Sequence, residues 1–139
     1  MTANLASHAF THLRLHTEFS INDGITTIGP LVKQLNTLEM PAVAITDISN
    51  LFGLIKFYTA AQRAGIKPVC GCDVLVEDET GNRTQLVLLV KSEKGYLNLT
   101  RLISEIYTRG DRIGDPLLQK RDLEGATEGL IALSGAQHS

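Results

Sequence analysis

Short apolar runs alternate with segments of helical periodicity along most of this chain, and this alternation limits the possible folds more than any other feature. Continuous apolar strands separated by helices of about 10–15 residues are typical of parallel βαβ units, in which helices cover both faces of the sheet. We therefore expect the α/β class. The expected strands are 10–16, 42–46, 66–76, 85–91 and 130–135, with amphipathic helices at about 28–38, 51–61 and 96–106.

Turn residues and helix caps refine this pattern. The stretch 78–82 reads Asp-Glu-Thr-Gly-Asn, which predicts a turn and therefore a hairpin between the third and fourth strands. Thr26 or Thr27 is expected to cap the first helix, and Ser49 or Asn50 the second. The second helix is expected to bury one stripe, Leu51, Leu54, Ile55, Tyr58 and Ala61. The segment 117–123 is ambiguous between strand and helix.

Length and composition predict one domain. The chain has 139 residues, of which 43% are hydrophobic, so we expect an N-terminal tail at 1–9 and a single folded unit over 10–139. Too few strands are available to close an eight-stranded barrel, so either the sheet is open or the chain is part of a larger domain. The paired thiols, Cys70 and Cys72, are too close for a Cys-x-x-Cys site and are expected to be reduced packing residues.

Charge and hydropathy exclude several classes of function. The formal net charge of −2 argues against a surface built mainly to hold phosphate backbones, so any contact with DNA is expected to be secondary. The first residues lack the basic start and apolar run of a signal peptide, and no window reaches the ~20 apolar residues of a membrane span. We therefore expect a cytoplasmic protein.

The stretch from Phe10 to Gly24 carries the densest set of chemically informative residues. Side chains two apart on a strand share a face, so His12, Arg14 and His16 are expected to line one polar surface while the intervening leucines enter the core. Two histidines with Asp23 nearby would suit a divalent metal. The arginine between them argues against a metal, because a guanidinium is always charged and has no lone pair to offer.

Other polar residues fall at or near the expected strand ends, where parallel α/β folds gather their chemistry. Asp47 closes the second strand, Asp73 lies within the third, and Gln85 opens the fourth. Each also has a structural interpretation: Asp47 could start a helix, His16 could orient the loop to Asp23, and backbone groups could satisfy His12. Asp73 needs a partner in an apolar strand, and Arg14 is the natural candidate.

Several of these stretches together resemble a known family, the PHP (polymerase and histidinol phosphatase) domain at the N-terminus of bacterial replicative DNA polymerase III alpha subunits. The likeness covers about residues 10 to 135, in order and with matching spacing. The matching stretches are 12–20 (HLRLHTEFS) with Asp23-Gly24, 44–47 (AITD), 50–53 (NLFG), 56–58 (KFY), 65–71 (GIKPVCG), 95–99 (GYLNL) and 129–135 (GLIALSG).

This resemblance implies a distorted, TIM-like α/β barrel with a multinuclear metal site, which in some members works as a proofreading phosphoesterase. It also implies that the site is eroded here. Metal-binding members have histidine at the Arg14, Ile48 and Gln85 positions, glutamate at Asp73 and cysteine at Ala136. The family's last ligands, an aspartate and a histidine, would lie beyond Ser139. The vestigial site would then comprise Arg14, His16, Asp23, Asp47, Asp73 and Gln85.

Our preferred hypothesis is a non-catalytic segment that supports the polymerase core and docks a proofreading exonuclease subunit, with no metal or other cofactor of its own. Arg14 would take the place of the metals and neutralise Asp23, Asp47 or Asp73. The Mg²⁺ of the parent polymerase would lie in later domains. The alternative is a working 3′–5′ exonuclease or pyrophosphatase that holds Zn²⁺ or Mn²⁺ on His16, Asp23 and Asp73. An open sheet edge also suggests self-association of the chain.

Overall fold

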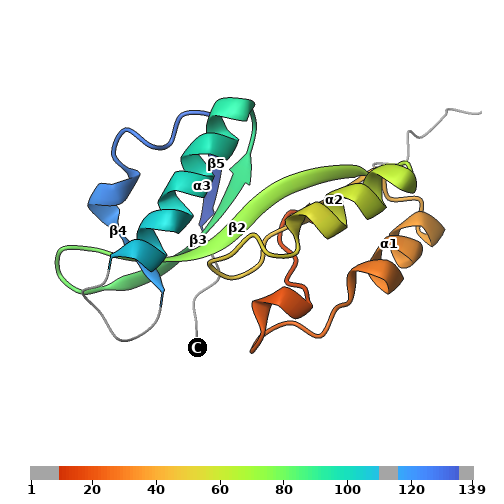
Figure 1. Ribbon diagram of the computed structural model, residues 1–139, viewed down its shortest axis with the longest axis horizontal. Coiled ribbons are helices and arrows are strands. Elements are labelled where there is room, and N and C mark those ends of the chain that lie inside the picture. The colour runs from red at the N-terminus through yellow and green to blue at the C-terminus, as the bar shows by residue number, and fades with distance from the viewer. Residues whose placement is uncertain (1–9, 110–115, 135–139) are drawn as a thin grey trace, which may run out of the picture.

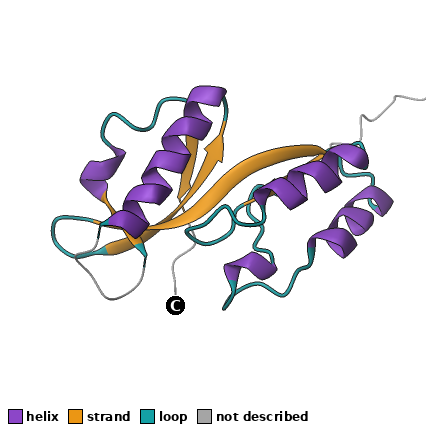
Figure 2. Ribbon diagram, viewed as in Figure 1, coloured by secondary structure: helices purple, strands orange, loops and turns teal. Residues whose placement is uncertain are grey.

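The computed structural model describes residues 10–109 and 116–134. Its elements alternate between helix and strand in the first half of the chain, as Figures 1 and 2 show. In chain order they are the 3-10 helix η1 (Glu18–Ser20), α1 (Ile28–Thr37), β1 (Ala42–Ile45), α2 (Leu54–Arg63), β2 (Lys67–Glu77), β3 (Arg83–Val90), α3 (Glu93–Thr108), β4 (Leu117–Gln119), the 3-10 helix η2 (Lys120–Leu123) and β5 (Leu130–Ser134). None of the described helices is long and apolar enough to cross a bilayer.

One mixed sheet organises the fold, in the strand order β1-β2-β3-β5, with β4 paired to β2. The long strand β2 pairs in parallel with β1 through its first half, from Ala42 opposite Lys67 to Ile45 opposite Cys70. Its second half pairs in parallel with β4 and antiparallel with β3. The α/β class, the β1-α2-β2 unit and the hairpin are therefore confirmed. The described part of the chain is an open sheet and does not show the expected barrel.

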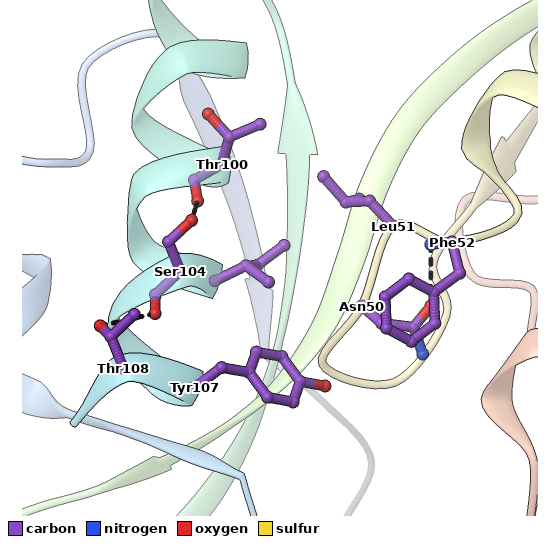
Figure 3. A pocket seen from close by; sticks show the side chains of 8 residues that line it. Asn50, Leu51, Phe52, Thr100, Ser104, Tyr107 and Thr108 are labelled. Atoms are coloured by element: carbon purple, nitrogen blue, oxygen red, sulfur yellow. Dashed lines mark hydrogen bonds between the residues drawn. The ribbon is translucent and has the colours of Figure 1, made fainter. Parts of the chain in front are cut away.

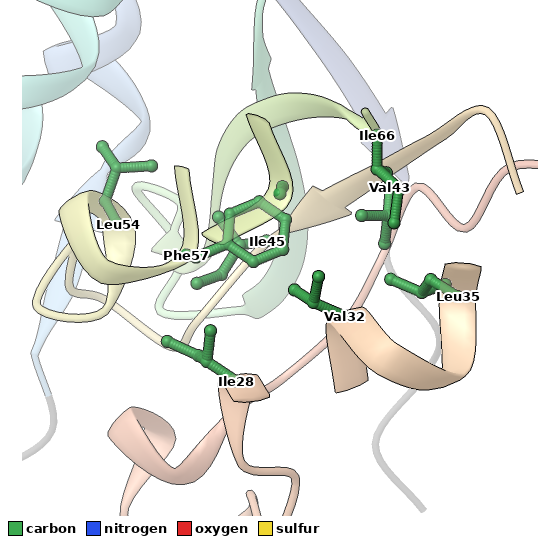
Figure 4. Close-up of a cluster of buried hydrophobic side chains, with 9 residues drawn as sticks. Ile28, Val32, Leu35, Val43, Ile45, Leu54, Phe57 and Ile66 are labelled. Atoms are coloured by element: carbon green, nitrogen blue, oxygen red, sulfur yellow. The ribbon is translucent and has the colours of Figure 1, made fainter. Parts of the chain in front are cut away.

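The three α-helices pack on one face of this sheet, contrary to the expectation that both faces would be covered. Alternate residues of β2 point to opposite faces. Cys72, Val74 and Val76 join the cluster that contains Leu99 and Leu102 of α3. Through Cys70 the same face of β2 also meets the cluster under α1 and α2, which Figure 4 shows around Phe57. The opposite face of β2 carries Asp73 and is left without a helix among the described residues.

The second helix differs from its predicted stripe. It begins at Leu54 after Gly53, not at Ser49 or Asn50, and it buries Leu54, Phe57 and Ala61. Ile55 is 74% exposed and Tyr58 is 40% exposed, so two of the predicted core positions were wrong. The reason is the later start: once Phe57 enters the core, with 0% of its surface exposed, the stripe rotates away from both residues.

The prediction of a regular first strand at 10–16 was also wrong. This segment lies alongside β1, where the carbonyls of His12 and Leu15 accept hydrogen bonds from Ala44 and Thr46 at 2.8 and 2.9 Å. Only an isolated parallel bridge between His12 and Val43 is formed, because Leu15 donates its amide to the Thr46 side chain instead of a backbone carbonyl. Leu13, expected in the core, is 43% exposed.

The C-terminal elements settle two open points. The ambiguous segment 117–123 forms the short strand β4 followed by η2, and the last predicted strand is β5. Gly135 and Ala136 lie outside the described residues.

Both cysteines are free, as expected for packing residues. Burial in the sheet raises the pKa of Cys72 to about 12, which keeps its thiol protonated and unreactive.

Candidate functional site

A chain of four polar side chains spans the helix-free face of β2. The Nε of Arg14 donates to Oδ2 of Asp73 at 2.7 Å. The Nε2 atom of His16 lies 2.9 Å from the same oxygen, and its Nδ1 atom lies 2.8 Å from Oδ2 of Asp23. Arg14 and His16 thus share one side of their segment, as their spacing predicts, and the arginine pairs with the aspartate for which it was the natural candidate.

Burial differs sharply along this chain of contacts. The Asp73 side chain has 0% of its surface exposed, that of His16 has 12%, and that of Asp23 has 63%. The Arg14 side chain is 36% exposed and reaches Asp73 from the rim. A buried carboxyl group carries a large desolvation cost unless hydrogen-bond donors compensate it, so the contacts from Arg14 and His16 offset the cost of burying Asp73.

The two carboxylates on either side of His16 favour its protonated form. The hydrogen bond to Asp73 raises the pKa of His16 above its ordinary value of 6.5, with a further contribution from Asp23 that burial and Arg14 partly oppose. Both ring nitrogens face carboxylate oxygens, and only an imidazolium can donate to both at once. An imidazolium has no free lone pair for a metal ion. The contacts that stabilise the protonated His16 therefore make it unsuitable as a metal ligand.

Asp73 itself is half satisfied. Oδ2 accepts from both Arg14 and His16, whereas Oδ1 is buried and has no hydrogen-bond partner among the described residues. The described residues contain no group of three or more His, Cys, Asp or Glu side chains placed to hold a metal ion. A guanidinium bonded to the central carboxylate further repels a cation. The donor set described in this structure therefore fits a multinuclear metal centre poorly.

Asp47 occupies a separate, neutral cage. Its Oδ1 accepts from the Thr17 amide at 2.6 Å and from the Ser20 hydroxyl at 2.7 Å, and its Oδ2 accepts from the Thr17 hydroxyl at 2.8 Å. Gly53 closes the cage, since a Cβ there would lie 2.7 Å from the Phe19 ring and 3.3 Å from Asp47 Oδ2. Asp47 ties the 17–20 turn to the end of β1 and does not act as a helix-start residue for α2.

The remaining predicted site residues lie around these two carboxylates. Ile48 forms an isolated parallel bridge with Asp73, so it belongs to the backbone frame of the site. Gln85 lies on β3 opposite Leu75, and its Oε1 is buried without a partner in the described part of the chain. His12 is exposed and packs edge-on against Phe10 at 4.7 Å between ring centroids. Ala136 lies outside the described residues.

Sequence reasoning missed the residues that hold Asp47. Thr17 is completely buried, and Ser20 is 8% exposed, although both are polar. Asn50 was expected only as a possible cap, yet its side-chain amide donates to the Phe19 carbonyl at 2.9 Å while its oxygen accepts from Phe52. The available signal was the pair of hydroxyl residues, Thr17 and Ser20, shortly after His16, where a buried strand would continue apolar.

A groove lies apart from these carboxylates, between α3 and the loop before α2 (Figure 3). Its volume is about 460 Å³. Three hydroxyl residues line its α3 wall, and each donates to a carbonyl of the preceding turn, so the wall offers no free hydroxyl hydrogen: Thr100, Ser104 and Thr108. Tyr107 crosses the groove floor and donates to the Ser49 carbonyl at 2.8 Å.

Sequence comparison finds close relatives of one kind. A protein from Pseudomonas aeruginosa named DNA polymerase III subunit alpha is 49% identical over 131 residues, and one of the same name from Escherichia coli K12 is 47% identical over 130 residues. These matches cover 93% and 92% of this chain. The chain spans only 11% of the length of each relative.

Comparison with solved structures supports the fold. An amidohydrolase from Chromobacterium violaceum superposes with a TM-score of 0.56 at 22% identity, over 70% of this chain and 33% of that one. A structure from Bifidobacterium adolescentis, named for metal-dependent phosphoesterase activity, gives 0.52 at 16% identity, over 70% and 32%. The family profile of the PHP domain matches residues 12–139, and on that match the chain belongs to the PHP domain family.

Proposed function

We propose that this chain is a non-catalytic PHP segment of a bacterial DNA polymerase III alpha subunit, in which an ion pair replaces the metal centre. The observation that supports this most strongly is the 2.7 Å contact between Arg14 Nε and the buried Asp73 carboxylate. The fixed positive charge of Arg14, bonded to Asp73 from the rim of the site, balances the carboxylate and needs no metal ion. The site then contributes stability and positions the surrounding loops.

A phosphoesterase mechanism has little support in this geometry. Such enzymes need metal ions at fixed separation and an activated water. Here His16 has both nitrogens engaged by carboxylates, and Oδ2 of Asp73 accepts from both Arg14 and His16. The alternative ligand set of His16, Asp23 and Asp73 would first have to break these contacts.

The wider context of the proposal comes from the relatives. Their shared name, DNA polymerase III subunit alpha, implies a polymerase that works in DNA replication. We further propose that this work takes place in the cytoplasm and that the Mg²⁺-dependent chemistry lies outside the 11% of the relatives' length that this chain spans. The missing length would also complete the distorted barrel of which the described sheet is one part. In that setting the segment is a scaffold for the polymerase core.

An activity assay separates the non-catalytic proposal from its alternative. We expect the purified chain, with Mn²⁺ or Zn²⁺ added, to release no nucleotide from single-stranded DNA and no phosphate from pyrophosphate above a chelator-treated blank. The contrary result would be metal-stimulated turnover that His16→Ala abolishes. Because His16 touches both carboxylates, its loss would remove any residual metal chemistry while leaving a contaminating nuclease untouched.

Docking of a proofreading exonuclease is the second part of the proposal. A segment without a hydrolytic site of its own would leave proofreading to another subunit, which it could hold on its surface. Calorimetric titration of the chain with the P. aeruginosa exonuclease subunit tests this directly. We expect saturable binding; its absence at tens of micromolar would remove the docking role and leave the scaffold role standing.

A further inference from the structure

The strand β5 forms one end of the sheet, and one of its edges is open in the part of the chain that the structure describes. It pairs with β3 alone, from Leu130 opposite Val90 to Ser134 opposite Leu86. The other end of the sheet is occupied, because the segment 10–16 lies along β1 and accepts hydrogen bonds from it. β5 therefore has a strand edge without a partner among the described residues.

The hydrogen bonds between β3 and β5 indicate which backbone groups lie on the open edge. The Lys91 amide donates to the Gly129 carbonyl at 2.8 Å, directly before the first pair of the ladder. In an antiparallel ladder, residues that exchange hydrogen bonds alternate with residues whose amides and carbonyls point away from the neighbouring strand. Starting from Gly129, this alternation directs the amides and carbonyls of Ala132 and Ser134 away from β3. These groups require water or another strand as a partner.

The sequence of β5 does not discourage pairing with another strand. Native proteins protect open edges with charged side chains, prolines or bulges. The stretch 130–134 is Leu-Ile-Ala-Leu-Ser, without a charge or a proline, and its register with β3 is continuous. Its residues are apolar except for Ser134, yet none is buried, and Ile131 is 46% exposed. The edge therefore combines unpaired backbone groups with exposed apolar side chains.

The outward-facing groups are arranged symmetrically about Ala132. A two-fold axis through Ala132 relates this strand to an antiparallel copy of itself, in which Ala132 is opposite Ala132 and Leu130 is opposite Ser134. Each Ala132 amide then faces the Ala132 carbonyl of the other copy. The same axis places Ile131 opposite Leu133 on the helix-free face, so apolar side chains meet there.

We propose that β5 pairs with β5 of a second copy of this chain, in an antiparallel register centred on Ala132, so that two sheets join into one. A second copy fits this edge because backbone donors match acceptors under the two-fold axis and no like charges within the strand are brought together. The contact involves one short strand from each copy, so we expect a weak dimer with a dissociation constant on the order of 100 µM. This inference goes beyond the proposed function and does not depend on whether the site binds a metal.

Sedimentation equilibrium of the purified chain tests the proposal over concentrations from about 10 µM to about 1 mM. We expect the average mass to rise from near that of one chain towards that of two. A monomer at every concentration would overturn the proposal and would leave the edge to a strand of a longer polypeptide. Larger aggregates without a dimer would also overturn it, because two-fold pairing uses up the edge.

Opposite charges at the two-fold axis test the register most sharply. Ala132→Lys and Ala132→Glu each place like charges directly opposite one another, so each variant alone should weaken dimerisation by about tenfold or more. Mixed in equal amounts, the two variants should form a heterodimer about tenfold or more tighter than either homodimer. Ala132 is exposed, so we expect both variants to retain the circular dichroism of the wild type. Undiminished dimerisation of each variant, or a mixture with no gain over them, would contradict the register.

A third variant and two controls complete the design. Ala132→Pro removes the outward amide without removing a hydrogen bond to β3, so we expect a folded monomer. The charge pair decides the question if the proline variant does not fold. Gln62→Lys, on the exposed surface of α2, controls for added charge and should leave the dimer unchanged. Phe52→Ser, at the apolar groove, should also leave it unchanged. Loss of the dimer in Phe52→Ser, with Ala132→Pro still dimeric, would overturn β5 as the interface.

Discussion

Asp47 and Asp73 are two buried carboxylates joined by a backbone hydrogen bond, from the Asp73 amide to the Asp47 carbonyl at 3.1 Å, yet they are stabilised in different ways. Among the described residues, the Asp47 carboxylate accepts only from an amide and hydroxyls of the 17–20 turn. Asp73 accepts from an arginine and a histidine, and one of its oxygens has no partner in the described chain.

The two sites differ in whether the described residues supply a hydrogen-bond donor to both oxygens of the carboxylate. The Asp47 cage is built from residues near in space to the end of β1, and it is fully formed in this chain. The Asp73 site balances charge with Arg14, but one of its buried oxygens has no hydrogen-bond partner among the described residues. The Asp47 carboxylate therefore has a structural role, whereas the Asp73 carboxylate has charged donors and one oxygen without a partner among the described residues.

The largest effect on stability should come from removing the Asp47 carboxylate. Asp47→Ala deletes the acceptor of Thr17 and Ser20 and leaves their buried donors unpaired, so we expect the free energy of unfolding to fall by about 3 kcal/mol or more. Urea denaturation followed by far-ultraviolet circular dichroism measures it. Glu79→Ala, in the exposed hairpin turn, is the matched control and should change little. A loss no larger than that of the control would show that the cage is not structural.

The ion pair should matter less, because Arg14 is partly exposed. Arg14→Met leaves Asp73 with His16 alone, and we expect a loss of about 1–2 kcal/mol in the free energy of unfolding. Adding Asp73→Leu to that variant should restore much of the loss, since an apolar pair leaves no uncompensated charge. If the double variant is less stable than Arg14→Met by the full cost of a second core mutation, the carboxylate is needed for another reason.

Stability should also depend on pH through His16. Its folded-state pKa is raised above 6.5, so its contribution is fully present below that pH and is lost as the pH rises through the folded-state value. The free-energy difference between the wild type and His16→Asn should therefore be largest below pH 6.5 and should shrink as the pH rises above it. Urea denaturation of both proteins across this range measures the difference. A difference that grows with pH would contradict a protonated His16.

The smallest effect should come from Asp23, whose side chain is 63% exposed. Asp23→Asn removes one carboxylate partner of His16 and should lower the pKa of that imidazole while changing the free energy of unfolding by less than about 1 kcal/mol. Proton NMR titration of the His16 ring resonances follows the pKa. An unchanged titration midpoint would mean that Asp73 alone sets the charge of His16.

The same contrast explains how far sequence reasoning reached. The Arg14 and His16 spacing could be read directly, because two residues apart on an extended segment always share a side, and a buried Asp73 required a cation. The Asp47 cage could not be read this way, since its donors Thr17 and Ser20 are reached only after a turn whose shape the residue pattern does not specify. Tertiary packing likewise decided which side of α2 was buried, because Phe57 and Ile55 are both apolar and only one fits the core.

The one-sided sheet was missed for a related reason. Apolar runs in β2 and β3 predict burial on both faces, but they do not say whether helices or another part of the polypeptide cover each face. The helix-free face is where Asp73, Gln85 and Leu133 gather, so the part of the fold that sequence periodicity described least well is the part that carries the candidate site.

Metal content tests the central claim most directly. The chain is purified without chelator, equilibrated with excess Zn²⁺ or Mn²⁺, desalted and measured by inductively coupled plasma mass spectrometry. We expect less than about one metal ion per ten chains, because the Arg14 guanidinium holds the Asp73 oxygen that a metal would need. One or more equivalents of tightly held metal per chain, lost in His16→Ala, would contradict it.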